Sequence, residues 1–186
     1  MITIISSEEM PQGSEKWAEF RKTRISGTDA YSLLKGTPIS EILHKKATNN
    51  FHGNYYTQRG HILEAEARDI YSQVNSPANE AGAIINSKYP NAMMSPDGTV
   101  GQDGLIEIKC FQPKRHFKVY RELDPTIIAQ IQFGLFISER EWCDLVLYNP
   151  DLEDPRDCFL TKRIRPIKST QSLFKKLLSK EAYHST

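Results

Sequence analysis

A short run of alternating residues, Leu105–Cys110, constrains this chain more than any other feature. Successive side chains of an extended strand point to opposite faces, so the apolar side chains at positions 106, 108 and 110 share one face. Glu107 and Lys109 share the other face with Leu105. We therefore predict a strand that buries one side and presents two ionisable groups together on the other.

A turn sequence, Ser95-Pro96-Asp97-Gly98, precedes this strand, and nine residues separate Asp97 from Glu107. Pro-Asp-Gly favours a turn, which can return Asp97 to the side of the strand. Two converging carboxylates offer the hard oxygen ligands that Mg²⁺ or Mn²⁺ prefers. A neighbouring cation such as Lys109 can hold an attacking water or stabilise developing negative charge. These residues together provide the minimum for metal-assisted hydrolysis of a phosphodiester.

Pro96-Asp97 followed by Glu107-x-Lys109 is typical of the PD-(D/E)xK nuclease signature. An alternative stays open on these residues alone. In that alternative, the hairpin has Asp97 and Gly98 only as turn residues, and Glu107 and Lys109 form its solvated face. The remainder of the chain has to separate the two interpretations.

Length and composition indicate one packed domain over residues 1–186, because 39% of the side chains are hydrophobic. A net charge of +1 with 25% charged residues excludes a disordered chain and a uniformly basic nucleic-acid coat. Basic residues concentrate instead near the C-terminal end, where they form either a solvated helix face or a nucleic-acid contact. They are Lys162, Arg163, Arg165, Lys168, Lys175, Lys176 and Lys180.

The compartment that the sequence indicates is the cytoplasm, or the cytoplasm of a host cell. Three widely spaced cysteines without a C-x-x-C pair favour reduced thiols over disulfides or zinc ligands. The N-terminal Met1–Ile5 has neither the length nor the basic start of a signal peptide. No apolar run approaches the roughly 20 residues of a membrane helix.

Hydrophobic periodicity predicts an α/β fold with a central mixed sheet flanked by helices. The strongest helix covers 58–74, with Leu63, Ala67, Ile70 and Tyr71 on one face. Further helices are expected from Ser14 or Gly13, over 30–34, 38–46, 125–136 and 169–182, and a loop is expected over 48–56. Strands are expected at 83–85, 92–94, 104–110, 142–148 and 158–164.

Three further polar residues are candidates for the same site, each with a structural alternative. Glu64 could add a third carboxylate, or form only an i, i+4 surface ion pair with Arg68. Gln130 interrupts an apolar helix, so its amide either satisfies backbone groups or faces the site, with Gln132 as the neighbouring alternative. For Arg21, the interpretation favoured by its helix position alone is an ordinary surface arginine.

An ordered set of motifs extends the pattern over residues 12–148. It comprises Gln12-Gly13, Trp17-x-x-x-Arg21, Ile25-Ser26-Gly27-Thr28, Gly60-x-x-x-Glu64-x-x-Ala67-Arg68, Ser95-Pro96-Asp97-Gly98, Glu107-Ile108-Lys109-Cys110 and Ala129-Gln130-Ile131-Gln132. In this order the motifs resemble the phage lambda exonuclease family, also called YqaJ-like viral recombinase nucleases. The resemblance implies a restriction-endonuclease-like core.

The resemblance also implies roles for individual residues. Two Mg²⁺ ions, which Mn²⁺ would replace, are expected on Glu64, Asp97, Glu107 and the backbone carbonyl of Ile108. Lys109 would orient the attacking water, and Gln130 would line the same centre. A terminal 5′-phosphate of duplex DNA would bind to Arg21, Thr28 and Ser95. A guanidinium and short hydroxyls suit that ligand.

The expected activity is 5′→3′ digestion of one strand from a duplex end, which leaves 3′ single-stranded tails for recombination. Expected partners are duplex DNA ends, a single-strand annealing protein and further copies of the chain in a trimeric ring. Thr28 replaces the serine that is usual in the family, and 37–58 and the C-terminal region match poorly. Two alternatives stay open: a restriction- or defence-type endonuclease on the same fold, and a non-catalytic DNA-binding protein with a decayed site.

Overall fold

The computed structural model describes residues 1–48 and 55–180 of the chain. The elements run in the order β1 (Ile2–Ser6), α1 (Glu15–Lys22), the 3₁₀ turn η1 (Gly27–Asp29), α2 (Ala30–Leu34), α3 (Ile39–Thr48), α4 (Tyr55–Val74), β2 (Ala78–Asn79), β3 (Ala81–Asn86), β4 (Gly98–Val100), β5 (Gly104–Lys109), α5 (Pro113–Arg121), α6 (Pro125–Ser138), β6 (Trp142–Tyr148), α7 (Pro155–Cys158), β7 (Phe159–Ile164) and α8 (Lys168–Lys180).

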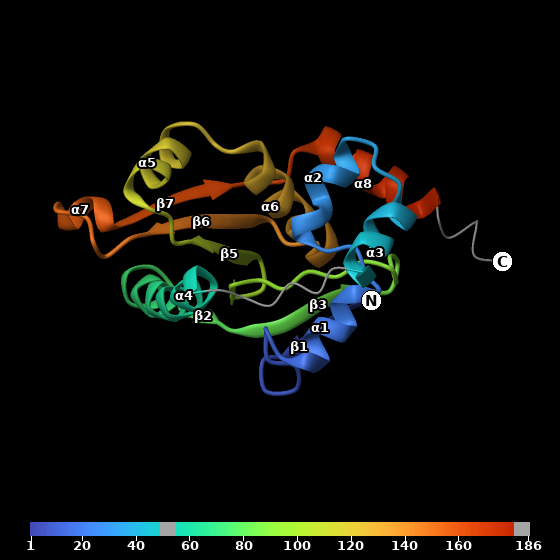
Figure 1. The fold of residues 1–186 in the computed structure, drawn as a ribbon, viewed down its shortest axis with the longest axis horizontal. Coiled ribbons are helices and arrows are strands. Elements are labelled where there is room, and N and C mark those ends of the chain that lie inside the picture. Colours follow the sequence, from blue (N-terminus) through green and yellow to red (C-terminus); the bar gives the residue numbers. More distant parts are fainter. Residues whose placement is uncertain (49–54, 181–186) are drawn as a thin grey trace.

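A five-stranded sheet in the order β2-β4-β5-β6-β7 forms the centre of the fold (Figure 1). Its central strands β5 and β6 run parallel, from the Gly104–Trp142 pair to the Lys109–Leu147 pair. The other neighbours in this sheet pair antiparallel. The predicted mixed sheet is therefore confirmed. β1 and β3 form a separate two-stranded antiparallel ribbon.

The sheet separates two hydrophobic clusters, because alternate residues of β5 enter different ones. Ile106 and Ile108 join the cluster to which α4 contributes Leu63, Ala67 and Tyr71. Leu105 joins the larger cluster, which holds the buried side chains of α6 and Phe174 of α8. The predicted alternation is thus confirmed, and α4 and α6 cover opposite faces of the motif strand.

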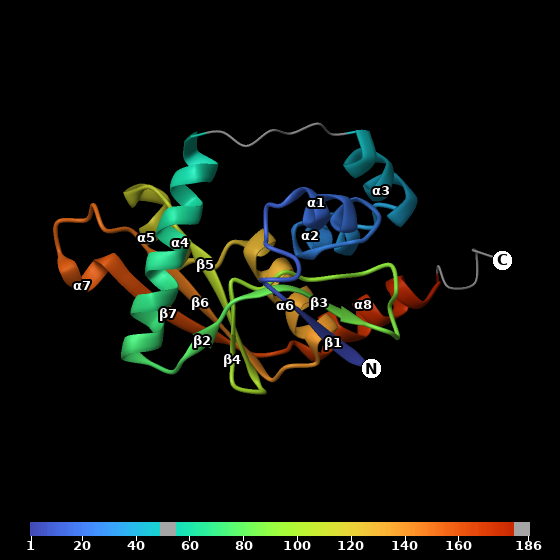
Figure 2. The same ribbon diagram turned by 90° about the horizontal axis from the view of Figure 1, so that it is seen from below.

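The helices divide between the two ends of the sheet (Figures 1 and 2). α4, α5 and α7 gather at one end, and α1, α2, α3 and α8 gather at the other, with α6 between the two groups. α1 begins after Ser14, one of the two starts that the sequence allowed, and the Ser14 side chain accepts a hydrogen bond from the Trp17 amide. α6 begins with Pro125 after the capping residue Asp124.

Two sequence predictions near the motif were wrong in detail. Residues 92–94 form isolated bridges, Ala92 with Ile25 and Met94 with Ile84, instead of a strand. Pro96 lies two residues after Met94 and has no N–H to continue a ladder. Gly98 begins β4 opposite Ile106 and is not a turn residue. A Cβ there would lie 2.8 Å from the Ile106 side chain, so close packing requires glycine.

Some elements were not predicted, and some predictions lie outside the described residues. β1 and α5 are two elements that the sequence analysis did not predict; β1 pairs antiparallel with β3, and α5 buries His116 and Val119. The loop expected over 48–56 falls mainly on 49–54, and the expected end of the last helix at Ala182 lies beyond 180. Within the described chain, no helix combines the length and apolarity needed to span a membrane.

Candidate active site

The polar face of β5 is buried, so its ionisable groups do not form a solvated surface. Glu107 is only 6% exposed. Its Oε1 lies 2.5 Å from the Nζ of Lys109 two residues along the same face. Burial by itself would lower the pKa of Lys109, but the charges of Glu107 and Asp97 raise it. The solvated hairpin that the sequence left open is therefore excluded.

Asp97 returns to the side of β5, as its turn sequence predicts. Its Oδ2 accepts a hydrogen bond of 2.6 Å from the Ile108 amide. Burial, together with the nearby charges of Glu107 and Glu64, raises the pKa of Asp97 well above its usual value, against the opposing effect of Lys109. The charges of three carboxylates therefore act on one another at this site.

Glu64 reaches this region from α4 and also pairs with Arg68. The ion pair that the sequence allowed is present but partly buried, with Glu64 Oε1 3.6 Å from Arg68 Nη1. Arg68 also donates to the backbone carbonyl of Asp97 at 2.6 Å and lies 3.2 Å from Glu80. The arginine therefore ties α4 to the turn of Asp97, and Glu64 lines the same cavity as Asp97 and Glu107.

The two glutamines of α6 have different surroundings. Gln130 Nε2 donates to Glu107 Oε1 at 2.6 Å, and its Oε1 accepts from Lys109 at 3.4 Å. Gln132 points away from β5 and is fully buried. It donates to the Arg165 carbonyl and accepts from the Ile167 amide. Gln130 therefore faces the candidate site, and Gln132 joins α6 to the segment before α8.

The carboxylates of Asp97 and Glu107 accept hydrogen bonds from groups of the protein. Among residues 1–48 and 55–180, no three acidic, histidine or cysteine side chains are placed to hold a metal ion as they stand. The donor set nevertheless fits a hard divalent cation, because all its ligands are oxygens. The mutual repulsion that raises the pKa of Asp97 would be relieved by a bound cation.

The backbone carbonyl of Ile108 is expected to bind a metal ion, so it must not be used in pairing with β4. The β4–β5 ladder ends at the Gly98–Ile106 pair, so Ile108 lies beyond it and gives its N–H to Asp97. The N–H and C=O of one strand residue point to the same side. Its carbonyl therefore faces the edge of the strand where Asp97 lies.

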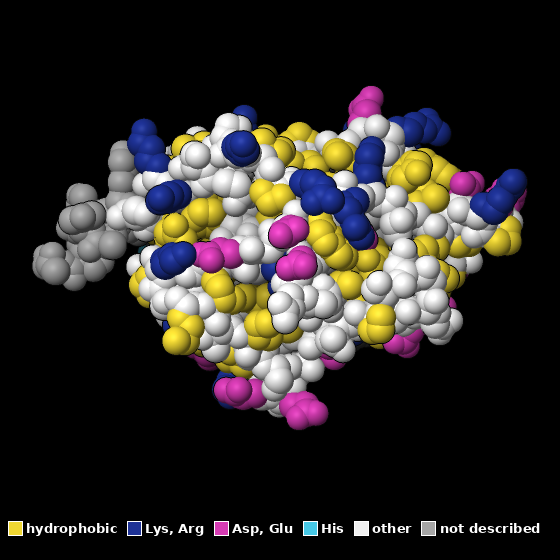
Figure 3. All heavy atoms as spheres, turned by 180° about the vertical axis from the view of Figure 1, so that it is seen from behind, with side chains coloured by type: hydrophobic (Ala, Val, Ile, Leu, Met, Phe, Trp, Pro, Cys, Tyr) yellow, Lys and Arg dark blue, Asp and Glu magenta, His cyan; other side chains and the backbone are white. Residues whose placement is uncertain are grey.

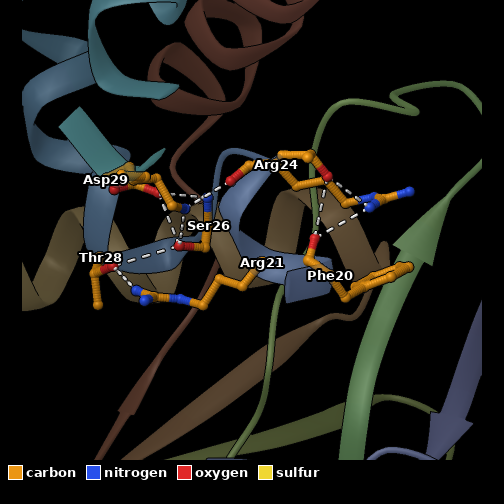
Figure 4. A network of polar contacts seen from close by, with 8 residues as sticks. Phe20, Arg21, Arg24, Ser26, Thr28 and Asp29 are labelled. Atoms are coloured by element: carbon orange, nitrogen blue, oxygen red, sulfur yellow. Dashed lines mark hydrogen bonds and ion pairs between the residues drawn. The ribbon is translucent and has the colours of Figure 1, made fainter. Parts of the chain in front are cut away.

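A second polar group forms between α1 and the turn before α2 (Figure 4). Arg21 Nη2 donates to the Thr28 hydroxyl across a short contact. The Arg21 guanidinium lies 5.2 Å from the centre of the Trp17 ring, and Trp17 Nε1 donates to Ser95 Oγ at 2.7 Å. The three residues predicted to bind a phosphate thus meet around Trp17.

One cavity of about 210 Å³ contains both groups. Its polar lining includes Arg21, Thr28, Ser95, Glu64, Asp97, Glu107, Lys109 and Gln130, which are all the side chains predicted for the site. Gly27 joins the two groups. A Cβ on this residue would lie 3.0 Å from Gln130 Cγ.

Sequence reasoning gave no site role to two residues that shape the cavity. Trp17 positions Arg21 and Ser95. Gln12 donates to the carbonyls of Ala81 and Pro96 at 2.9 and 2.8 Å, and so holds the turn of Asp97 against β3. Their only signal was their place in the ordered motifs.

The charged surface is uneven despite the net charge of +1. On the face shown in Figure 3, lysines and arginines lie mostly over the upper half, and acidic groups reach the lower edge. Part of the predicted basic C-terminal group has a structural role, because Arg163 pairs with Asp144 at 2.8 Å and stacks on Trp142.

A mixed sheet covered by α4 and α6, with Asp97, Glu107 and Lys109 at one strand, defines a nuclease domain of the restriction-endonuclease-like fold. The model of the YqaJ-like viral recombinase domain matches residues 16–141. The chain belongs to this family.

Solved structures of exonucleases share the fold. LHK-Exo in complex with dAMP is 24% identical, with a TM-score of 0.80 and 92% of each chain covered. The alkaline exonuclease LHK-Exo from Laribacter hongkongensis is 25% identical over 91% of this chain and 95% of that one, with a TM-score of 0.71. A phage-related exonuclease from Haemophilus somnus 129PT is 14% identical over 91% and 99%, with a TM-score of 0.56. No curated protein matches the sequence.

Proposed function

We propose that the protein is a Mg²⁺-dependent deoxyribonuclease that digests one strand of duplex DNA from its 5′ end and leaves 3′ single-stranded tails. One observation carries the proposal: a single cavity joins an acidic, lysine-containing centre to a group of one arginine and two hydroxyls. Such a cavity can hold a terminal phosphate beside the next phosphodiester.

The acidic centre would hold two Mg²⁺ ions, or Mn²⁺ in their place, on Glu64, Asp97, Glu107 and the carbonyl of Ile108. When bound, such ions polarise the phosphodiester and lower the pKa of a water molecule. Gln130 holds Glu107 in a fixed orientation through its 2.6 Å hydrogen bond. The Nζ of Lys109, directed to the same oxygen of Glu107, orients the attacking water and stabilises the negative charge of the transition state.

The second group would bind the 5′-phosphate. Trp17 fixes the plane of the Arg21 guanidinium, which can donate two parallel hydrogen bonds to phosphate oxygens. The hydroxyls of Thr28 and Ser95 can donate to the remaining oxygens. Ser95 lies two residues before Asp97, so the bound phosphate sets the distance from the strand end to the reacting centre.

Duplex DNA ends are the proposed substrate, in the cytoplasm of a host cell. A trimeric ring of this chain and a single-strand annealing partner belong to the same proposal and rest on the family.

Two assays test this function. The first compares linear duplex with covalently closed circular duplex, with Mg²⁺ and with a chelator. Degradation of the linear form alone, only with Mg²⁺, is expected. Cleavage of the closed circle would favour an endonuclease, and no cleavage of either would favour a DNA-binding protein with a decayed site.

The second assay labels each strand separately and compares 5′-phosphorylated with 5′-hydroxyl ends. The 5′-phosphorylated strand is expected to be lost from its 5′ end and at the higher rate. Loss from 3′ ends would contradict the direction, and equal rates on the two ends would contradict the phosphate site.

A further inference from the structure

A partly buried ion pair lies next to the proposed phosphate site. Asp29 Oδ2 accepts three hydrogen bonds, from the Ser26 amide at 2.8 Å, from the Ser26 hydroxyl at 2.8 Å and from Lys46 Nζ at 2.6 Å. Figure 4 shows Asp29 bound to Ser26 on the turn that also carries Thr28. One carboxylate oxygen therefore organises the whole turn.

Lys46 comes from a different element, α3, and has no other role in the site described above. Its Nζ also donates to the Arg24 carbonyl at 2.6 Å and to Ser26 Oγ at 3.1 Å. The side chains of Lys46 and Asp29 are 13% and 14% exposed. Burial, and to a smaller extent the charge of Arg21, lower the pKa of Lys46, whereas Asp29 raises it.

The position of Asp29 poses an electrostatic problem for an anion site. The hydroxyl of its neighbour Thr28 accepts a hydrogen bond from Arg21 and lies 3.4 Å from Ser26 Oγ. A carboxylate one residue from a phosphate-binding hydroxyl repels a phosphate, which carries a charge of about −1.5 to −2 at pH 7. Lys46 neutralises the negative charge of Asp29. Its hydrogen bonds to Arg24 and Ser26 also fix the turn that presents Thr28.

We propose that Lys46 and Asp29 are a positioning pair that sets the selectivity of the Arg21–Thr28–Ser95 site for a terminal phosphate. Lys46 does not touch the DNA. It removes the repulsion of Asp29 and holds the Thr28 turn against Arg21. This inference rests on the proposed phosphate site.

The test measures the ratio of kcat/KM on 5′-phosphorylated duplex to that on 5′-hydroxyl duplex, at one salt concentration. Lys46→Met keeps the length of the side chain and exposes the charge of Asp29. We expect the ratio to fall about tenfold, as for one uncompensated charge near a partly exposed anion. An unchanged ratio in folded Lys46→Met protein would overturn the proposal.

The double variant Lys46→Met/Asp29→Asn separates charge from packing. It lacks both charges, so we expect its ratio to return to within about threefold of the wild-type value, in line with the removal of that repulsion. A pair needed only for packing would leave the double variant no better than Lys46→Met, and that result would contradict the proposal.

Asp29→Asn covers the case in which Lys46→Met does not fold. It keeps Lys46 and an oxygen acceptor, so a ratio equal to or above the wild-type value is expected, and a tenfold fall would contradict the proposal. Thermal unfolding confirms that each variant is folded.

Lys45→Met is the matched control, because Lys45 lies next in the chain but forms an exposed pair with Glu41. Its ratio is expected to equal that of the wild type, and a fall like that of Lys46→Met would mean that any charge on α3 affects binding. A wild-type ratio of one would refute the phosphate site itself. A wild-type preference that survives Lys46→Met would refute only the positioning pair.

Discussion

The two glutamines of α6 allow a paired test of the site, because they lie two residues apart and have opposite surroundings. Replacing Gln130 with leucine removes the 2.6 Å hydrogen bond to Glu107 and leaves the rest of α6 in place. Replacing Gln132 with leucine removes the acceptor of the Ile167 amide and the donor to the Arg165 carbonyl, in a fully buried position.

The magnitudes follow from these contacts. Each buried group left without a partner costs about 1–3 kcal/mol, so Gln132→Leu should lose roughly 2–4 kcal/mol of unfolding free energy. For a chain of this length that loss lowers Tm by about 5–15 °C. Gln130→Leu releases an acidic side chain in the reacting centre. Loss of a hydrogen bond to an expected metal ligand lowers activity on the order of 10- to 100-fold, so we expect a fall in kcat of that size and little change in Tm.

The assay combines thermal unfolding with kcat on linear 5′-phosphorylated duplex, corrected for the folded fraction. Gln130→Leu should lose turnover and keep its Tm. The Tm of Gln132→Leu should fall, and its turnover per folded molecule should stay at the wild-type value. If Gln130→Leu turned over at the wild-type rate, or if both variants lost both properties equally, the assignment of the two amides would be wrong.

Further predictions concern the metal and phosphate groups. Asp97→Ala or Glu107→Ala should abolish cleavage and keep DNA binding, measured by gel shift, because each removes a metal ligand; normal cleavage would refute the centre. Lys109→Ala should lower kcat by about 100-fold, equivalent to about 3 kcal/mol. Ca²⁺ in place of Mg²⁺ should support DNA binding without turnover. Mg²⁺ should raise the Tm of the wild-type protein by relieving carboxylate repulsion, and an unchanged Tm at saturating Mg²⁺ would contradict this. Arg21→Ala should bring the 5′-phosphate to 5′-hydroxyl rate ratio close to one, and a preserved ratio would refute the phosphate site.

Local periodicity explains what could be predicted from the sequence. The alternation of Leu105–Cys110 predicts a strand with Glu107 and Lys109 on one face, because side-chain direction in a strand depends only on the order of residues. The apolar stripe of α4 predicts its buried face for the same reason, at a helical period. The turn sequence indicated that Asp97 returns to the strand, and the antiparallel pairing of β4 with β5 fixes it there.

Contacts between distant segments were decided by the tertiary structure alone. Helical periodicity does not tell which glutamine of α6 faces β5, and packing of α6 on the sheet settles it for Gln130. Trp17 meets Ser95 across 78 positions, and Lys46 meets Asp29 from another helix. The identity of a side chain states which bonds it can make, but its partner depends on where the folded chain brings another polar group into the same buried space.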